Sequence, residues 1–372
     1  MLALVPDVYD LSPGQRYRIE QWDPHLLRSG VEITYVPFLS AELRAMLTKP
    51  GGHGGKAWSL ISAFANRLQA LREAKQFDVV YVYREIAVLG PAWLESYLAY
   101  LKLPVVFDFD DAIFLRYIST SNGYFSLLKF PSSKTRALCR LSAHVMVGNE
   151  YLASYARQFN QNVSVIPTTI DLTKYTLFPK PANEVPVIGW TGSHSTVRYL
   201  SLIRQALERV ATIERFRLRL IGSSGQQFDL ANSPVEAVAW NSLTEADDLR
   251  VLDVGIMPMP DDLWARGKCA CKALQYMALG IPVVCSGVGV VNEIIQDGVN
   301  GFLANSEEEW IEKLVRLLRD PHLRQDMGMK GRQTVESRFS GASWAREVGR
   351  IFRSAAGVAE KGQSRTLSAA CR

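Results

Sequence analysis

Short apolar runs of strand type alternate with helical segments along almost the whole chain, and this alternation constrains the fold more than any other feature. In the first half, the expected strands cover residues 1–5, 31–37, 77–83, 104–111, 144–148 and 163–167. Strands that alternate with helices at this spacing form a parallel sheet with helices on both faces. The first half of the sequence therefore predicts one doubly wound α/β domain.

The alternation stops once and then restarts. Residues 172–184 are polar and irregular, a composition typical of a linker. Beyond them, further strands are expected over residues 185–190, 216–221, 235–240, 254–259 and 282–285. We therefore expect two doubly wound domains, residues 1–175 and 185–340, that face each other across a cleft. Residues 341–358 are expected to form a last helix that returns to the first domain, and residues 359–372 a disordered tail.

The composition excludes several other classes of protein. With 48% hydrophobic and 21% charged residues, the chain of 372 residues has ample material for two cores. Its formal net charge of +5 is too small to indicate a nucleic acid partner. There is no apolar run of about 18 residues and no basic leader, so we expect neither a membrane span nor a signal peptide. The five cysteines are odd in number and lack zinc spacing, which favours reduced thiols in the cytoplasm and no metal site.

A stretch in the second half combines glycine turns with closely spaced lysines. Lys268 and Lys272 can place both ammonium groups on one face of a helix expected over residues 271–279. Backbone N–H groups at a helix N-terminus and nearby lysines suit an anion, and a nucleoside diphosphate is the natural candidate. An ordinary helix with two solvated lysines explains the same residues equally well.

Two loops of the first half are expected at the edge of the sheet where ligands bind. The strand at residues 1–5 leads through Gly14 into a helix over residues 15–27, a turn typical of nucleotide-binding domains although it lacks the G-x-G-x-x-G pattern. The strand at residues 104–111 ends in Asp110 and Asp111, which either hold a hydroxyl group or cap the following turn. Asp108 alternates to the other face of that strand.

Residues 112–149 contain no acidic residue. Basic and aromatic side chains are interleaved there, namely Arg116, Tyr117, Tyr124, Phe125, Lys129, Phe130, Lys134, Arg136 and Arg140. Such a surface suits anionic lipid or a phosphorylated acceptor, which predicts peripheral contact with the inner face of a membrane. A solvated basic face is the alternative interpretation.

Four short motifs occur in order along the chain: VIPTTID at residues 165–171, GWTG at 189–192, QYMALGIPVV at 275–284 and GVGVVNE at 287–293. They are similar, in turn, to V-I-P-N-G-V-D, to the first strand and turn of a donor domain, to E-A-M-A-x-G-x-P-V-V and to a glycine turn that ends in Glu. Together these motifs resemble those of the retaining glycosyltransferases of family 4. The resemblance covers nearly the whole chain and implies the GT-B fold, in which two Rossmann-like domains face a cleft.

The resemblance implies a reaction as well as a fold. The second domain would bind a UDP-, GDP- or dTDP-sugar, and the first would bind a glycan, lipid-linked or small-molecule acceptor, as in polysaccharide biosynthesis. The sugar would be transferred with retained anomeric configuration, and neither a metal nor a cofactor would be needed. The leaving diphosphate would lie beside the acceptor hydroxyl group and help to take its proton.

The resemblance also assigns donor-binding residues by position. Diphosphate and sugar contacts are expected from Gly14, Gln15, Gly192, Ser193, Arg198, Lys268, Lys272, Asn292 and Glu293. Other interpretations stay open for three side chains: Arg198 as a solvated helix residue, Glu293 as a helix cap, and His194 as a merely exposed residue.

Three positions depart from the family pattern. The two glutamates of the family's E-x7-E arrangement fall on Gly267 and Gln275. The amide of Gln275 can still pair with ribose hydroxyl groups, whereas Gly267 has no side chain. Asp110 stands where the family often has a His. The chain is therefore either a divergent active transferase, a sugar-nucleotide-binding subunit without its own turnover, or a sugar-nucleotide epimerase of the same build.

Overall fold

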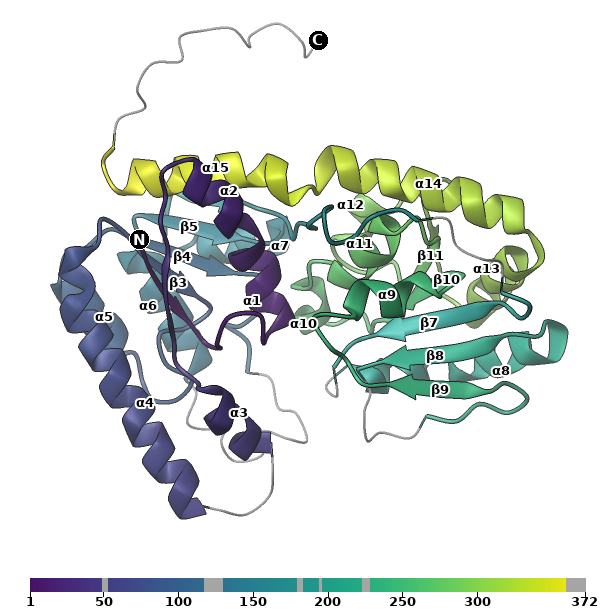
Figure 1. The fold of residues 1–372 in the computed structure, drawn as a ribbon, viewed down its shortest axis with the longest axis horizontal. Coiled ribbons are helices and arrows are strands. Elements are labelled where there is room, and N and C mark those ends of the chain that lie inside the picture. The colour runs from purple at the N-terminus through teal and green to yellow at the C-terminus, as the bar shows by residue number, and fades with distance from the viewer. Residues whose placement is uncertain (49–52, 117–129, 179–182, 194–195, 223–227, 359–372) are drawn as a thin grey trace, which may run out of the picture.

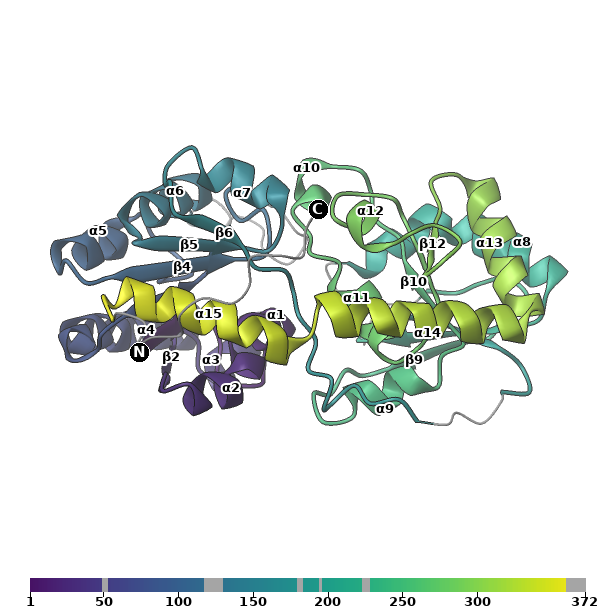
Figure 2. The same cartoon turned by 90° about the horizontal axis from the view of Figure 1, so that it is seen from above.

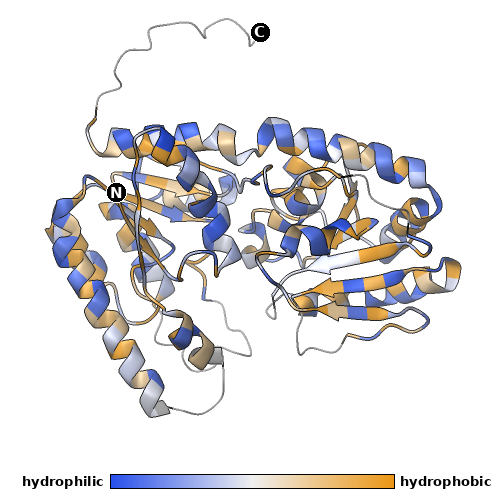
Figure 3. Cartoon of the chain, viewed as in Figure 1, coloured by the Kyte–Doolittle hydropathy of each residue, from blue (hydrophilic) through white to orange (hydrophobic). Residues whose placement is uncertain are grey.

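The computed structural model describes residues 1–48, 53–116, 130–178, 183–193, 196–222 and 228–358. Within these ranges the chain forms two α/β domains that lie side by side, each built on a six-stranded sheet (Figure 1). The strands of both sheets are mainly hydrophobic, whereas the outer helices mix hydrophobic and hydrophilic residues (Figure 3). The predicted fold class, two doubly wound α/β domains, is confirmed.

The N-terminal sheet has parallel strands in the order β2-β1-β3-β4-β5-β6. These are β1 (Leu2–Val5), β2 (Thr34–Pro37), β3 (Val80–Tyr83), β4 (Val105–Phe109), β5 (His144–Val147) and β6 (Val163–Val165). The helices are α1 (Pro13–Arg18), α2 (Asp23–Arg28), α3 (Ala41–Thr48), α4 (His53–Glu73), α5 (Trp93–Tyr100), α6 (Pro131–Leu141) and α7 (Glu150–Ala156). The strand order reverses between β1 and β3, and ligands of such sheets bind at the switch point, outside the carboxyl ends of the strands.

The C-terminal sheet repeats this plan in the order β12-β11-β10-β7-β8-β9, with its switch point between β7 and β10. Its strands are β7 (Val187–Thr191), β8 (Arg217–Ile221), β9 (Val235–Val238), β10 (Val254–Met257), β11 (Val283–Cys285) and β12 (Phe302–Leu303). Its helices are α8 (Arg204–Ile213), α9 (Glu245–Arg250), α10 (Leu263–Arg266), α11 (Cys271–Ala278), α12 (Val291–Ile294), α13 (Glu307–Arg319) and α14 (Pro321–Arg338).

The chain passes from one domain to the other twice, and the two crossings touch. The N–H group of Ile170 donates to the carbonyl of Phe339 (2.8 Å), and its own carbonyl accepts from Gly341 (2.9 Å). After the second crossing, α15 (Gly341–Ala355) lies against the N-terminal domain, in line with α14 (Figure 2). Its buried side chains Val348 and Phe352 share a core cluster with β1 and α2, so both ends of the chain belong to the N-terminal domain.

The helix expected over residues 15–27 is interrupted. The chain forms α1, a short 3-10 helix (Glu20–Trp22) and then α2, with Ile19 at φ −146° between the first two. Pro24 lies in the first turn of α2 and has no backbone N–H to continue a helix from Glu20. As a result, α1 can direct Arg16 and Tyr17 toward the second domain independently of α2.

Candidate functional site

A cavity of about 920 Å³ lies between the carboxyl ends of the two sheets. The N-terminal domain contributes Gly14, Arg84, Asp110 and Asp111 to its wall, among others. The C-terminal domain contributes, among others, Gly192, Ser193, Lys268, Lys272 and Gln275. Arg84 was not among the twelve predicted site residues, and the other eight residues named here were. The fold therefore brings eight of the twelve predicted site residues to one cavity.

Arg84 links the two aspartates that follow β4. Its Nε and Nη2 donate to Asp110 Oδ1 (3.0 and 2.8 Å), and Nη2 also donates to Asp111 Oδ2 (2.6 Å). The Tyr83 hydroxyl group donates to the same Asp110 oxygen (2.8 Å). Arg84 adopts a left-handed conformation (φ 63°), and strained backbone of this kind concentrates at functional sites. Asp110 Oδ2 takes part in none of the hydrogen bonds among the described residues, which leaves it available to a ligand.

Asp111 connects the two domains through Lys268. The Lys268 Nζ donates to Asp111 Oδ1 (2.7 Å). Burial opposes ionisation of the Asp111 carboxyl, but the charges of Lys268 and Arg84 outweigh it and lower its pKa below the ordinary value. Burial likewise opposes the charge of Lys268, and the neighbouring Asp111 outweighs it, so the pKa of Lys268 is raised. Both groups are therefore charged at neutral pH.

Lys272 lies in the first turn of α11, whereas Lys268 precedes this helix and is separated from it by Ala270 in a left-handed conformation (φ 55°). The two lysines therefore do not share one helix face as expected, and their environments differ. Its Nζ sits 5.5 Å from the centre of the Trp190 ring, and no salt bridge between described residues includes it. Burial, together with the charge of Lys268, lowers the pKa of Lys272 to about 8. A cation that is partly desolvated and without a carboxylate partner is well suited to bind an anionic ligand.

The turn after β7 admits no side chain at Gly192. A Cβ atom there would lie 2.5 Å from the Trp190 ring and 2.8 Å from Thr196 Oγ1. The backbone of Gly192 and Ser193 thus approaches the cavity closely, beside Lys272. This combination of a glycine turn and lysines is an anion-binding arrangement.

Gln275 lies in a buried polar cluster instead of facing open space. Its Nε2 is within hydrogen-bond distance of Tyr17 Oη (2.7 Å), Tyr175 Oη (2.8 Å) and Glu245 Oε1 (2.9 Å). An amide nitrogen has two hydrogens, so it can donate to two of the three at a time. Tyr17 belongs to the N-terminal domain, which means that the predicted ribose residue also joins the two domains.

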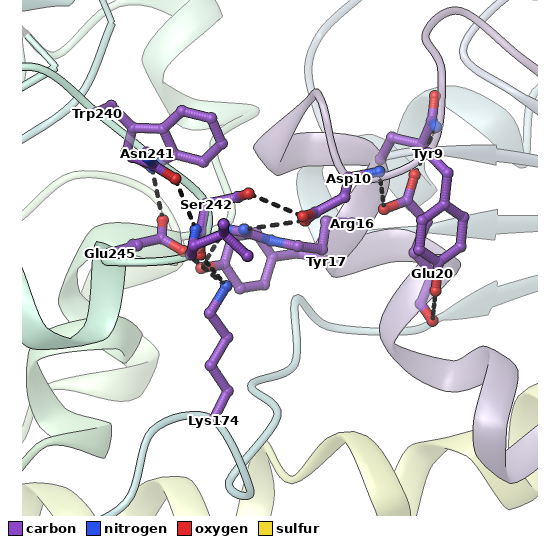
Figure 4. Close-up of polar contacts among 12 residues, drawn as sticks. Tyr9, Asp10, Arg16, Tyr17, Glu20, Lys174, Trp240, Asn241, Ser242 and Glu245 are labelled. Carbon is purple, nitrogen blue, oxygen red and sulfur yellow. Dashed lines mark hydrogen bonds and ion pairs between the residues drawn. The ribbon is translucent and has the colours of Figure 1, made fainter.

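The interdomain network around Glu245 extends this contact (Figure 4). Arg16 of α1 forms an ion pair with Glu245 of α9, and both side chains are almost completely buried. Ser242 Oγ donates to Asp10 Oδ2 (2.8 Å) across the same boundary. Lys174 donates to the Ser242 carbonyl (2.5 Å) and lies 3.7 Å from Glu245. We refer to Asp10, Arg16, Lys174, Ser242 and Glu245 as the interdomain network.

Four predicted site residues do not line the cavity. Gln15 is buried, and its amide bonds to the backbone of Asp7 and to Glu20. Arg198 is exposed beside the Tyr199 ring. Asn292 and Glu293 are exposed, and the Asn292 amide donates to the carbonyl of Gly287 (3.0 Å). The structure therefore does not bring these four side chains together with the other predicted site residues, and their donor contacts stay predictions.

The place of the family's first glutamate is filled by the other domain. A Cβ atom at Gly267 would lie 2.7 Å from the backbone nitrogen and the Cβ of Ala112. Asn149 of the N-terminal domain fixes the same segment by donating to the carbonyls of Arg266 (3.3 Å) and Lys268 (3.0 Å). A longer side chain at position 267 would push the domains apart.

The basic stretch is only partly a surface. Lys134 is buried, donates to the Ala87 carbonyl (2.6 Å) and lies 3.4 Å from Glu85. It lines the cavity, so the prediction that this side chain faces lipid is wrong. Exposed positions of the stretch are Arg116, Phe130, Arg136 and Arg140. Of the residues named in the sequence analysis, those that lie outside the described ranges are Tyr117, Tyr124, Phe125, Lys129, His194 and the tail at 359–372.

Among the described residues, no group of three or more His, Cys, Asp or Glu side chains could hold a metal ion. Within the same ranges, no helix is both long and apolar enough to cross a membrane.

The sequence of this chain is similar to a known protein family and to several known proteins. Residues 185–320 match the family model Glycosyl transferases group 1. D-inositol 3-phosphate glycosyltransferase from Arthrobacter sp. (strain FB24) is 26% identical over 226 residues, covering 54% of this chain and 51% of that protein. Trehalose synthase from Pyrococcus horikoshii is 37% identical over 65 residues, covering 18% of this chain and 16% of that protein. The chain thus spans about half, or less, of the length of these curated relatives.

Solved structures match along both domains. Sucrose-phosphate synthase from Thermosynechococcus elongatus has a TM-score of 0.67 at 15% identity and covers 96% of this chain and 99% of its own. Anabaena HepE, solved in complex with UDP and glucose, has a TM-score of 0.64 at 13% identity and covers 95% of this chain and 99% of its own. The chain has the GT-B fold. Its C-terminal half contains a glycosyl transferase group 1 domain.

The GT-B cleft also contains residues that the sequence did not single out: Tyr17, Arg84, Lys134 as a wall residue, and Glu245. For Arg84 a signal was present, because it directly follows the strand expected over residues 77–83 at the ligand-binding edge of the sheet. Tyr17 and Glu245 lie on helices, where no local pattern separates a residue that faces the cleft from one on a solvated face.

Proposed function

We propose that the protein is a glycosyltransferase that moves a sugar from a nucleoside diphosphate sugar to an acceptor hydroxyl group, with retention of configuration and without a metal or cofactor. The observation that carries the proposal is the opposition of two sets of groups across one cavity. Gly192, Lys268 and Lys272 form an anion-binding wall, and Asp110 and Asp111 face it from the other domain. The cavity is large enough for a nucleotide sugar and an acceptor group together.

In this proposal the C-terminal domain binds the donor. The turn at Gly192 and Ser193 and the two lysines hold the diphosphate, and Gln275 lies toward the ribose. UDP-sugars are the first candidates because HepE was solved with UDP and glucose. GDP- and dTDP-sugars are further candidates and are tested in the same assay.

The N-terminal domain then presents the acceptor. Asp110 Oδ1 is held by Arg84 and Tyr83, so Oδ2 accepts a hydrogen bond from the acceptor hydroxyl group and orients it. The bond between sugar C1 and the diphosphate oxygen breaks while the bond from C1 to the acceptor oxygen forms. The hydroxyl proton passes to the leaving phosphate oxygen, whose negative charge Lys268 and Lys272 stabilise.

The test is release of nucleoside diphosphate from UDP-, GDP- and dTDP-sugars, measured with the purified protein in the presence of a metal chelator. We expect release from one donor class, and we expect Asp110→Asn to slow it by at least tenfold with nucleotide affinity unchanged. Transfer to an added acceptor, followed by NMR of the anomeric carbon, reports whether configuration is retained.

The alternatives give different results in the same assay. A binding subunit without turnover would bind a nucleotide sugar and release nothing. An epimerase would interconvert two nucleotide sugars without any acceptor. Either result, or a rate abolished by the chelator, would contradict the proposed transfer.

A further inference from the structure

The apolar side of α4 extends beyond the part that packs on the N-terminal core. Ala63 and Leu71 face the core and are buried. Phe64 is half-buried at the edge of that contact, and Ile61 and Trp58 continue from it at helical spacing around the exposed side. Ile61 is 61% exposed and Trp58 is 73% exposed. Helix α4 runs along the outer side of the molecule, away from the second domain (Figure 1).

Helix α5 adds further exposed rings to this surface. The Phe64 and Trp93 rings lie 6.2 Å apart, which joins the two helices, and Trp93 is 54% exposed. At the other end of α5, Tyr97 stacks on Tyr100 (6.5 Å), which is 79% exposed. We call these six side chains the aromatic band: Trp58, Ile61, Phe64, Trp93, Tyr97 and Tyr100. Exposed apolar surface that is continuous in this way marks a docking site more often than isolated apolar residues do.

The two segments that carry the aromatic band have no exposed carboxylate, although α4 itself ends one residue further on in the exposed Glu73. Residues 43–72 contain no Asp or Glu. Residues 86–107 contain one, Glu95, whose residue is 1% exposed. The described basic residues of these segments that reach the surface at least in part are Lys56, Arg72, Lys102 and Arg44, the last of which forms an ion pair with Asp7. The exposed surface of the two segments, as far as the structure describes it, therefore carries cations and no carboxylate.

We propose that the aromatic band docks on a bilayer that contains anionic phospholipids. Trp and Tyr side chains favour the interface between hydrocarbon and headgroups, and Lys and Arg beside them are attracted to anionic headgroups. A second copy of this chain fits the surface poorly, because pairing two such faces would bring cations against cations.

Helix α3 lies between the aromatic band and the cavity. Helix α3 packs against α4 and carries Arg44, which lines the cavity. The acceptor would then be a lipid-linked sugar or lipid headgroup that reaches the cavity from the bilayer. This last step rests on the proposed function, whereas the docking itself does not.

The experiment is sedimentation of the full-length protein with vesicles of pure phosphatidylcholine and with vesicles that also contain phosphatidylglycerol. We expect binding to the anionic vesicles at low salt, and its loss at high salt. Substituting Trp58→Ser together with Ile61→Ser should weaken this binding by about tenfold or more, because the two most exposed anchors of α4 are lost. The matched control is Leu202→Ser with Ile213→Ser, two exposed apolar residues of the C-terminal domain (55% and 43% exposed), which should bind as the unaltered protein does.

Three outcomes would overturn the proposal: no binding to anionic vesicles, equal binding by the Trp58/Ile61 variant, or a dimer in solution that this variant dissociates. UDP affinity of the variant, measured in the absence of vesicles, should equal that of the unaltered protein and shows that the variant is folded. Vesicle binding without turnover would support the docking and contradict the proposed sugar transfer. The two proposals can therefore be tested separately.

Discussion

The Asp111 carboxylate lies between two cations, Lys268 and Arg84, where the anionic group of a ligand could also bind. Each of its oxygens accepts a hydrogen bond from one of these cations, at 2.7 and 2.6 Å. A diphosphate that binds at Lys268 must therefore compete with Asp111 for the same ammonium group. This competition distinguishes Asp111 from Asp110, whose Oδ2 accepts no hydrogen bond from the residues that the structure describes.

The competition predicts an unusual direction of effect for Asp111→Asn. The variant should bind UDP more tightly, by roughly fivefold (about 1 kcal/mol), because a partly exposed ion pair no longer opposes the phosphate. Titration calorimetry with UDP and with uridine measures this, and uridine binding should not change. Asp261→Asn, which removes an exposed ion pair with Arg266 away from the cavity, is the matched control. Weaker UDP binding by Asp111→Asn would show that Asp111 supports the site instead of competing in it.

Lys272 predicts a pH dependence of nucleotide binding. Its pKa is lowered to about 8, first by burial and then by Lys268. A bound diphosphate favours the charged ammonium group, so affinity should be full below pH 8 and fall as the pH rises through 8, by at most about tenfold for each pH unit. UDP affinity measured from pH 7 to 9 tests this, and Lys272→Met should show weak binding without the slope. The same slope in Lys272→Met would assign the titration to another group.

The glycine turn after β7 acts as one element with Trp190 and α11, because the Trp190 ring lies beneath Gly192 and beside Lys272. Gly192→Ala should displace the turn, lower the free energy of unfolding by about 1–3 kcal/mol through overpacking, and weaken UDP binding by about tenfold or more. Gly55→Ala in α4 is the control, since a Cβ there meets nothing within 4 Å, and it should leave UDP binding unchanged. Thermal unfolding and calorimetry give the two readouts.

At the scale of elements, the sequence predicts the strands and the loops at their carboxyl ends, because buried parallel strands and their glycine turns leave a local pattern. Lys268, Asp110 and Asp111 follow from such patterns, whereas the role of Gly192 follows from the resemblance of the four motifs. Side chains on short helices could not be placed. The direction of α1 depends on the break at Ile19, so Arg16 and Tyr17 reach the second domain while Gln15 turns into its own domain, and no periodicity separates the three.

At the scale of the molecule, the two crossings meet at Ile170 and Gly341 on one side of the cleft. The interdomain network and the pair of Lys268 and Asp111 join the domains on the side of the cavity. Paired crossings of this kind can act as a hinge, while polar contacts across the cleft hold one arrangement. The most buried of these contacts is the ion pair of Arg16 and Glu245.

We expect the cleft to open when one partner of this ion pair is removed. In Glu245→Ala the guanidinium group of Arg16 would lose its buried counter-ion and keep only Asp10, which lies 3.5 Å away and is partly exposed. Such a loss destabilises the arrangement by up to about 3–5 kcal/mol. The closed arrangement can avoid this cost by rotating about the hinge, which exposes Arg16 to water. Small-angle X-ray scattering should therefore show a larger radius of gyration for Glu245→Ala than for the unaltered protein, and saturating UDP should reduce the difference. Glu236→Ala removes an exposed pair with Arg219 within the C-terminal domain and should leave the radius unchanged. An unchanged radius in Glu245→Ala would mean that the remaining contacts, above all Lys268 with Asp111 and Gln275 with Tyr17, suffice to keep the GT-B cleft closed.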